Sequence, residues 1–154
     1  MFFVVAPGVV AGIVPWWLTG WRAAPATWWL LPVRAAGLVL ISAGGGVLVH
    51  SFVRFVAEGA GTPAPIAPPS QLVVGGLYRY VRNPMYLSVL AVIVGQALWL
   101  VRPPLLLYAA VVLVAFTAFV RRYEEPTLSR RFGVEYEAYR RAVPRWWPRL
   151  HPRE

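Results

Sequence analysis

Residues 84–121 read PMYLSVLAVIVGQALWLVRPPLLLYAAVVLVAFTAFVR, and this stretch decides the fold. Two apolar runs, 84–101 and 104–121, are separated only by Arg102 and Pro103. A membrane-spanning helix needs about 17 to 25 mostly apolar residues, so each run is long enough to cross a bilayer. The short connection predicts a tight hairpin of two membrane helices, with legs of about 27 Å at 1.5 Å per residue.

Two further apolar runs precede this hairpin, at residues 2–18 and 35–53. The first contains Pro7 and Pro15 and is expected to be kinked, whereas the second carries no charge. No strand-like alternation competes with these helical runs. The sequence therefore predicts an all-α integral membrane protein, with four transmembrane helices in a single domain, 1–154.

The composition supports this class. Of the 154 residues 58% are hydrophobic and only 14% are charged, against about 25% charged residues in a soluble domain. Disorder needs low hydrophobicity and is excluded. No cysteine is present, and His50 and His151 are too few and too far apart for a ligand set, so no metal site is predicted.

The arginines predict the orientation in the membrane. With four spans, the termini, the loop 54–83 and the tail 122–154 share one side, which holds twelve of the fifteen arginines. The other side holds Arg22, Arg34 and Arg102. The positive-inside rule then places both termini in the cytoplasm. The loop 54–83 is rich in glycine and proline and is expected to be irregular.

The net charge of +9 raises the alternative of nucleic-acid binding. Because most arginines follow the predicted cytoplasmic ends, we interpret them as orientation signals and as contacts to anionic lipids, and we expect no nucleic-acid partner. In the tail, Leu128, Phe132, Tyr136 and Tyr139 recur at spacings of three or four. This pattern predicts one amphipathic cytoplasmic helix over 127–142, lying at the membrane interface and followed by an aromatic-basic anchor at 144–148.

A first candidate motif is GGLYRYVRNPMY at 75–86. Asn83 is a good N-cap and Pro84 suits a first helical turn, so the motif leads into a helix N-terminus. Free N–H groups there, beside Arg79 and Arg82, attract a carboxylate or a phosphate. The alternative interpretation is a cap, a helix start and two orientation arginines.

The second candidate is the adjacent pair Glu124 and Glu125, which directly follows an apolar run. Carboxylates there are costly unless they are paired. The alternative to a ligand site is pairing with Arg121 and Arg122. Pro126 is expected to end the helix. Because both hairpin legs have equal length, the two motifs should lie at one depth, where together they suit a zwitterion bearing a carboxylate and an ammonium.

At these residues the chain resembles a known superfamily. GLYRYVRNPMY (76–86) and YEEPTLSRRFGVEYEAYRRAVPRW (123–146) are similar to the isoprenylcysteine carboxyl methyltransferases and phospholipid methyltransferases, integral membrane enzymes that use S-adenosylmethionine. The resemblance implies cofactor-binding residues at these positions: Gly76, Tyr78, Arg82, Asn83, Pro84, Tyr86, Glu124, Glu125, Tyr136 and Tyr139. Of these, Arg82 and Glu125 are implied to be catalytic.

Two positions depart from the family pattern: Leu77 stands in place of a proline and Asn83 in place of a histidine. Because asparagine does not titrate near neutrality, a proton shuttle at residue 83 is not expected. The resemblance implies methyl transfer from S-adenosylmethionine to a lipophilic acceptor from the bilayer, at the cytoplasmic face. Prenylcysteine, aminophospholipid, quinone or terpenoid, and small thiol acceptors remain open, as do the general base and the oligomeric state. The competing hypothesis is a non-catalytic scaffold or anionic-lipid-binding protein of the same fold.

Overall fold

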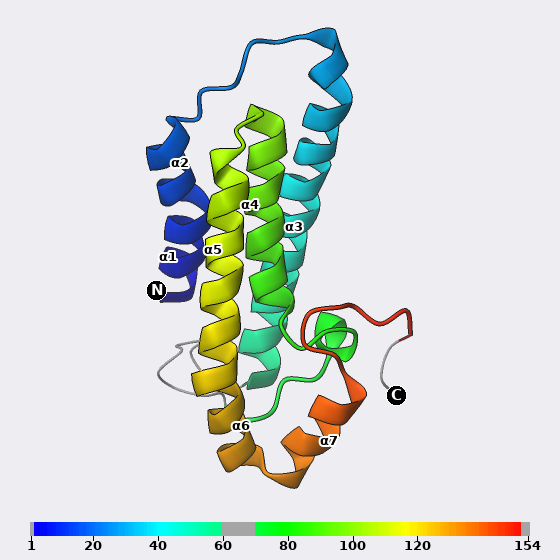
Figure 1. Ribbon diagram of the computed structural model, residues 1–154. Helices are drawn as coiled ribbons and strands as arrows, with labels where there is room; N and C mark the ends of the chain where they lie inside the picture. The colour runs from blue at the N-terminus through cyan, green and yellow to red at the C-terminus, as the bar shows by residue number, and fades with distance from the viewer. Residues whose placement is uncertain (1, 60–69, 152–154) are drawn as a thin grey trace. The chain divides into compact units, whose positions relative to one another are not determined.

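The computed structural model describes residues 2–59 and 70–151, and all regular structure within these ranges is helical (Figure 1). The α-helices are α1 (Phe2–Gly8), α2 (Val14–Thr19), α3 (Leu31–Gly59), α4 (Pro84–Leu100), α5 (Pro104–Phe119), α6 (Glu125–Phe132) and α7 (Val134–Ala142). Two π-helical turns, η1 (Val9–Ile13) and η4 (Val120–Glu124), and two 3-10 turns, η2 (Trp28–Leu30) and η3 (Gly76–Arg79), connect them. The prediction of an all-helical protein is confirmed for the described part of the chain.

Two helical stretches, Trp28–Glu58 and Pro104–Phe132, are long and apolar enough to cross a membrane. Only 17% and 22% of their apolar windows are buried, whereas a core helix of a soluble protein is mostly buried. Large apolar side chains such as Val39, Leu107 and Val114 are 66–71% exposed along them. This exposure favours association with a membrane. Two shorter apolar helices, Val5–Thr19 and Pro84–Leu100, complete the set of four apolar segments.

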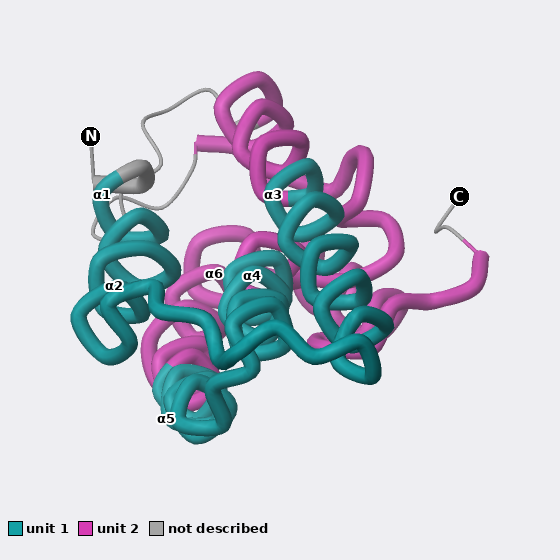
Figure 2. Tube along the Cα trace, turned by 90° about the horizontal axis from the view of Figure 1, so that it is seen from above, with its two compact units in different colours: residues 1–47, 87–115 teal, residues 48–86, 116–154 magenta. Residues whose placement is uncertain are grey.

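The chain forms two compact units, residues 1–47 with 87–115 and residues 48–86 with 116–154 (Figure 2). In the first unit, α4 and α5 form the predicted hairpin with a turn at 101–103. The Arg102 N–H donates to the Ala97 carbonyl at 2.9 Å and closes this turn. Ala97, Leu100 and Leu105 form a small core beneath it.

Within the same unit, glycines let α3 and α4 approach closely. A Cβ atom on Gly37 would lie 2.5 Å from the Trp99 nitrogen, and one on Gly95 would lie 2.8 Å from the Gly37 carbonyl oxygen. Of the run at 44–46, only Gly44 takes part, because a Cβ there would lie 3.0 Å from the Ser88 carbonyl oxygen. Small residues at a helix contact are typical of membrane bundles, because backbone-to-backbone contact replaces the hydrophobic driving force.

The π-turn η1 widens the first helical stretch. Main-chain carbonyls of this turn accept hydrogen bonds from neighbouring side chains. The Tyr108 hydroxyl donates to the Val10 carbonyl at 2.8 Å, and the Gln96 amide donates to the Ala11 carbonyl. The Trp21 indole N–H donates to the Gln96 side-chain oxygen at 3.2 Å. These three side chains are thus satisfied within the first unit, whereas the Thr27 hydroxyl and the Arg34 Nε are buried without a hydrogen-bond partner among the described residues.

The second unit is built on α6, α7 and the segment 70–86. Tyr136, Tyr139 and Val143 are buried against Leu72, Val74, Leu128, Phe132 and Ala142. The apolar-aromatic face predicted for the tail therefore packs within this unit. The segment 143–149 is bonded to the motif main chain, because the Arg82 N–H donates to the Pro144 carbonyl and the Arg149 N–H donates to the Tyr80 carbonyl.

Several predicted boundaries need correction. Helix α3 extends to Gly59, six residues into the predicted loop 54–83; Gly61, Pro63, Pro65, Pro68 and Pro69 of that loop lie outside the described residues. Pro126 does not end the helix, which continues to Phe132. The π-turn η4 ends at Glu124, two residues before this proline, and widens the helix there, which makes room for the proline ring.

The amphipathic helix predicted over 127–142 is two helices, α6 and α7, broken at Gly133. Gly133 has φ +52° and ψ −122°, a conformation that an L side chain rarely adopts. The glycine therefore allows the chain to turn and lets α7 pack on α6, where the Ser129 hydroxyl donates to Glu137 at 2.9 Å.

Candidate functional site

The first motif forms a 3-10 turn that leads into helix α4. Gly76 opens η3 with φ +57°, which requires glycine. The helix begins at Pro84, as predicted. Asn83 is buried, and its side-chain amide donates to the Arg145 carbonyl at 3.2 Å. This side chain therefore ties the motif to the segment after α7.

The centre of the site is a buried ion network around Glu125. The Arg82 guanidinium lies 2.7 Å from Oε1 of Glu125. The Arg145 Nε donates to Oε1 at 2.9 Å and its Nη2 donates to Oε2 at 2.6 Å, a bidentate pair. The side chains of Arg82 and Glu125 are each 10% exposed. The alternative sequence interpretation, pairing with Arg121 and Arg122, is wrong for Glu125.

Glu124 points to a different partner. The Tyr86 hydroxyl donates to its Oε2 at 2.9 Å, and the Tyr86 ring packs on Phe116 with centroids 4.7 Å apart. The predicted span ends at residue 121, so Glu124 lies beyond it. Burial raises the pKa of Glu124, and the Tyr86 hydrogen bond opposes that rise. Glu124 therefore has surroundings different from those of Glu125, its neighbour in the sequence.

The π-turn η4 sets where the two carboxylates point. The Glu125 N–H donates to the Val120 carbonyl, five residues back, instead of the usual four. Relative to an unbroken α-helix, the extra residue rotates Glu125 and the rest of α6 by about 100° around the axis. Such π-turns are frequent at functional sites, and here one separates the surroundings of two adjacent glutamates.

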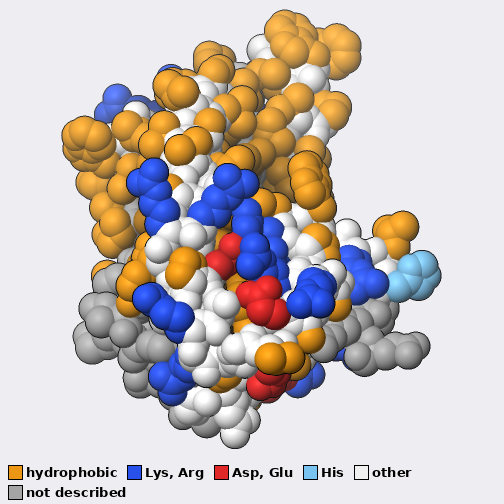
Figure 3. Space-filling model, turned by 60° about the horizontal axis from the view of Figure 1, so that its bottom comes forward, with side chains coloured by type: hydrophobic (Ala, Val, Ile, Leu, Met, Phe, Trp, Pro, Cys, Tyr) orange, Lys and Arg blue, Asp and Glu red, His pale blue; other side chains and the backbone are white. Residues whose placement is uncertain are grey.

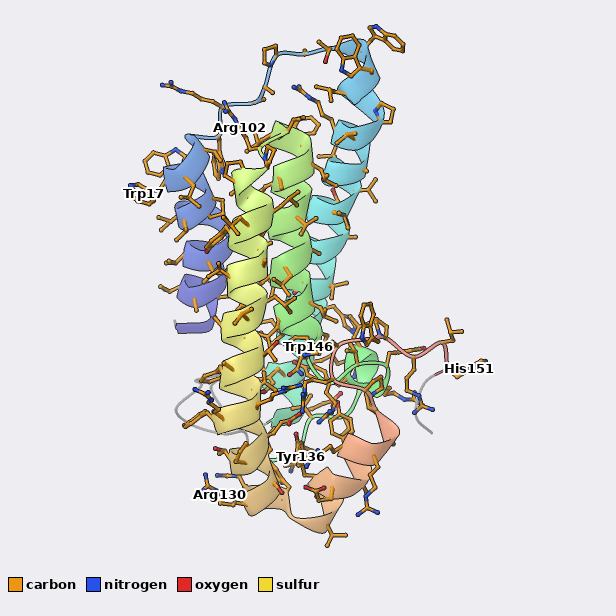
Figure 4. The ribbon with its side chains drawn as sticks, viewed as in Figure 1. Trp17, Arg102, Arg130, Tyr136, Trp146 and His151 are labelled. Carbon is orange, nitrogen blue, oxygen red and sulfur yellow. The ribbon has the colours of Figure 1, made fainter. Side chains whose placement is uncertain are left out.

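Three tyrosines enclose the network. The Tyr139 hydroxyl donates to the Tyr78 carbonyl at 2.7 Å, and Arg82 donates to the Tyr136 hydroxyl at 3.4 Å. In Figure 4 Tyr136 lies on the inner side of α7, whereas Arg130 and His151 project outward. Burial raises the pKa of Tyr78, and burial together with Glu125 raises the pKa of Tyr136. In these two hydrogen bonds the hydroxyl group of Tyr139 donates and that of Tyr136 accepts.

A cavity of about 30 Å³ lies among these groups. It is lined by Arg82, Asn83, Val120, Glu124, Glu125, Leu128, Tyr136 and Tyr139. The volume holds about one water molecule. Figure 3 shows acidic side chains bordered by arginines on the face that it displays. Within the described ranges, no three His, Cys, Asp or Glu side chains gather as a metal-ligand set.

Six of the ten predicted cofactor-binding residues line this cavity, from three segments distant in sequence. Tyr78 and Tyr86 contact the same cluster, whereas Gly76 faces His50 and Arg54 of α3, and Pro84 is the first residue of α4. Of the ten predicted residues, Gly76 and Pro84 thus lie outside the cavity and its tyrosine contacts.

Two site residues were missed by sequence reasoning. Arg145 was assigned to the aromatic-basic anchor, and nothing in its neighbours indicates a pair with Glu125. Glu58 accepts the Gly75 N–H at 2.9 Å. Its spacing of four from Arg54 was a usable signal, because residues at i and i+4 share a helix face.

The sequence model of the phospholipid methyltransferase family matches residues 33–135, two thirds of the chain. The match includes the motif at 76–86 and both glutamates of the cavity. The chain belongs to the phospholipid methyltransferase family. Neither the curated proteins nor the solved structures gave a match. The resemblance to the superfamily is thus confirmed, and the chain is a methyltransferase by family.

Proposed function

We propose that the chain is an S-adenosylmethionine-dependent methyltransferase that acts on a lipophilic acceptor at the cytoplasmic face of a membrane. The family supports methyl transfer to lipids. The observation that carries the cofactor assignment is the charged cluster of Arg82, Arg145, Glu124 and Glu125, in which Glu125 is buried and the other three are partly buried. Two guanidinium groups beside two carboxylates match the opposite charges of an amino-acid moiety.

The donors and acceptors fit the aminocarboxylate end of S-adenosylmethionine. The Nε of Arg82 is buried and has no hydrogen-bond partner among the described residues, so one donor remains for a carboxylate. The Oε2 of Glu125, which accepts from Arg145, suits an ammonium once that pair is exchanged. When bound, the cofactor supplies an activated methyl group on a sulfonium.

The cavity of about 30 Å³ accommodates only part of such a molecule, since ligand pockets commonly measure about 300–1,000 Å³. The segment 143–149 lies against the motif through hydrogen bonds from Arg82 and Asn83. We infer that this segment shifts when the cofactor binds. Arg145 would then exchange its pair with Glu125 for the cofactor carboxylate.

The acceptor determines what else the site must do. A carboxylate acceptor needs only desolvation and alignment with the methyl group. An amine acceptor must also lose a proton, and burial raises the pKa of Glu124, which suits a proton acceptor. Glu124 is therefore our candidate for the general base with an amine, and Glu125 and Arg82 are candidates for positioning the reactants.

The membrane arrangement belongs to the same proposal. We propose four spans with both termini in the cytoplasm, supported by four apolar helical segments and the arginine asymmetry of the sequence. The exposed arginines of α6 and α7 would contact anionic lipid headgroups. A lipophilic acceptor would then enter from the bilayer, and the cofactor from the cytoplasm.

The test is calorimetric binding of S-adenosylmethionine and its demethylated product, S-adenosylhomocysteine, to the purified chain in detergent. We expect saturable binding and transfer of labelled methyl to extracted host lipids, with the product identified by mass spectrometry. Glu125→Gln should weaken binding about tenfold, as expected for a lost charged hydrogen bond. The exposed Glu135→Gln in α7 is the matched control and should bind as the unaltered chain does.

Absence of binding to a helical, folded preparation would overturn the cofactor assignment. Binding without methyl transfer to any lipid fraction would overturn the enzymatic proposal and favour the alternative, a non-catalytic lipid-binding protein of the same fold. Equal affinity of Glu125→Gln and the unaltered chain would remove Glu125 from the site.

A further inference from the structure

The end of helix α3 carries three polar side chains on one face, at His50, Arg54 and Glu58. Their spacing of four residues aligns them along the helix. Arg54 and Glu58 form an ion pair with a distance of 3.1 Å. All three lie against the glycine pair that opens the first motif, in the same compact unit.

Glu58 holds the motif by its main chain. Its Oε2 accepts the Gly75 N–H at 2.9 Å, while its Oε1 accepts from Arg54 at 3.1 Å. Both carboxylate oxygens are therefore engaged, one by the helix that carries it and one by the loop. A hydrogen bond from a main-chain N–H to an ionised carboxylate is among the stronger ones in proteins.

The glycines at 75 and 76 leave room for these contacts. A Cβ on Gly75 would lie 2.0 Å from Oε1 of Glu58 and 2.6 Å from its Oε2. A Cβ on Gly76 would lie 2.9 Å from Nε2 of His50. Gly75 has φ −85° and ψ 171°, which any residue adopts. Its lack of a side chain is therefore explained by Glu58 and not by the backbone conformation.

We propose that Glu58 is a positioning residue for the cofactor site, acting through Gly75. The 3-10 turn that follows Gly75 carries the Tyr78 carbonyl, which accepts from Tyr139, and leads directly to Arg82. A fixed main-chain position at Gly75 therefore restricts where the Arg82 side chain lies relative to Glu125. The inference rests on the proposed function, since it assigns Glu58 to the support of that site.

The test compares four variants and one control by calorimetric binding of S-adenosylhomocysteine and by thermal unfolding in the same detergent. Glu58→Ala should weaken binding about tenfold. Glu58→Gln should recover most of the affinity, because its amide oxygen still accepts the Gly75 N–H. Gly75→Ala should weaken binding as Glu58→Ala does, because the methyl group displaces the carboxylate.

The double variant Glu58→Ala with Gly75→Ala should bind no more weakly than either single variant, because both remove one contact. The exposed Glu135→Ala is the control and should leave affinity unchanged. Failure of the unaltered chain to bind would overturn the proposed function and this inference with it. Binding by the unaltered chain, with Glu58→Ala lowering only the unfolding temperature, would overturn the positioning role alone. Additive losses in the double variant would also overturn it.

Discussion

Replacing Arg145 by methionine tests the buried ion network directly. Methionine keeps the apolar stem of the side chain and removes the guanidinium, so the change isolates the charge. In the structure this guanidinium makes a bidentate pair with Glu125, at 2.9 and 2.6 Å. The Arg145 side chain is 20% exposed and that of Glu125 is 10% exposed, so solvent screens the pair weakly.

The expected magnitude depends on the partners that Glu125 retains after the change. A hydrogen bond to a charged group contributes about 1.5–3 kcal/mol. Glu125 still has Arg82 at 2.7 Å, so its charge is not left without a partner. We therefore expect Arg145→Met to lower the free energy of unfolding by about 2–3 kcal/mol. Glu125→Ala should cost more, about 3–5 kcal/mol, because it leaves two buried cations facing each other.

The assay is reversible unfolding of the purified chain in mixed micelles, followed by circular dichroism as the denaturing detergent is increased. Arg141→Met is the matched control, because Arg141 is exposed on α7. Surface changes of this kind usually fall within about 0.5 kcal/mol. A double-mutant cycle between Arg145→Met and Glu125→Gln then isolates the coupling of the pair, which we expect to exceed about 1 kcal/mol.

Two results would refute the reasoning. If Arg145→Met costs no more than Arg141→Met, the buried pair does not contribute to stability. If the coupling energy falls within about 0.5 kcal/mol of zero, the two side chains act independently. Either result would also remove the reason for placing Arg145 at the cofactor carboxylate.

Three other substitutions, two of them with a matched control, probe the fold by the same unfolding measurement. Gly37→Ala should destabilise by about 1–3 kcal/mol, because its Cβ meets main-chain atoms of α4 that cannot yield; Gly45→Ala, with nothing within 4 Å, should stabilise α3 by about 0.5–1 kcal/mol. An equal effect of the two would contradict the close helix contact. Gly133→Ala should cost about 1–3 kcal/mol through backbone strain alone, and no loss would contradict the break between α6 and α7. Tyr139→Phe should cost about 1–3 kcal/mol by leaving a buried carbonyl unbonded, whereas the exposed Tyr123→Phe should be neutral.

The helices could be predicted from the sequence because their signals are local. Apolar runs of sufficient length, interrupted only by Arg102 and Pro103, give the α4–α5 hairpin without any knowledge of packing. The start of α4 follows from Pro84, whose ring suits a first turn. The helix boundary expected at Pro126 and the unbroken helix expected over 127–142 were wrong, because the π-turn η4 and the conformation of Gly133 depend on more than local propensity.

The candidate site was partly predictable for the same reason. Arg82 and Glu125 were placed together by counting equal helix legs, and a hydrogen bond does join them. Their further partners were not predictable. Arg145 is 20 residues from Glu125, in a segment without regular structure. Its position depends on contacts between distant segments, such as the hydrogen bond from the Asn83 side chain to the Arg145 carbonyl, which no local pattern encodes.

By itself, then, the sequence determined the class of protein, its helical segments, its family motifs and the small set of charges available for chemistry. These depend on composition, periodicity and spacing, which act along the chain. Only the tertiary structure decided which charges meet: Glu125 with two arginines, Glu124 with Tyr86, and Glu58 with Gly75. The physical reason is that an ion pair or hydrogen bond acts over about 3 Å. Its partners are therefore selected by packing and by one extra residue in a helical turn, not by proximity in the sequence.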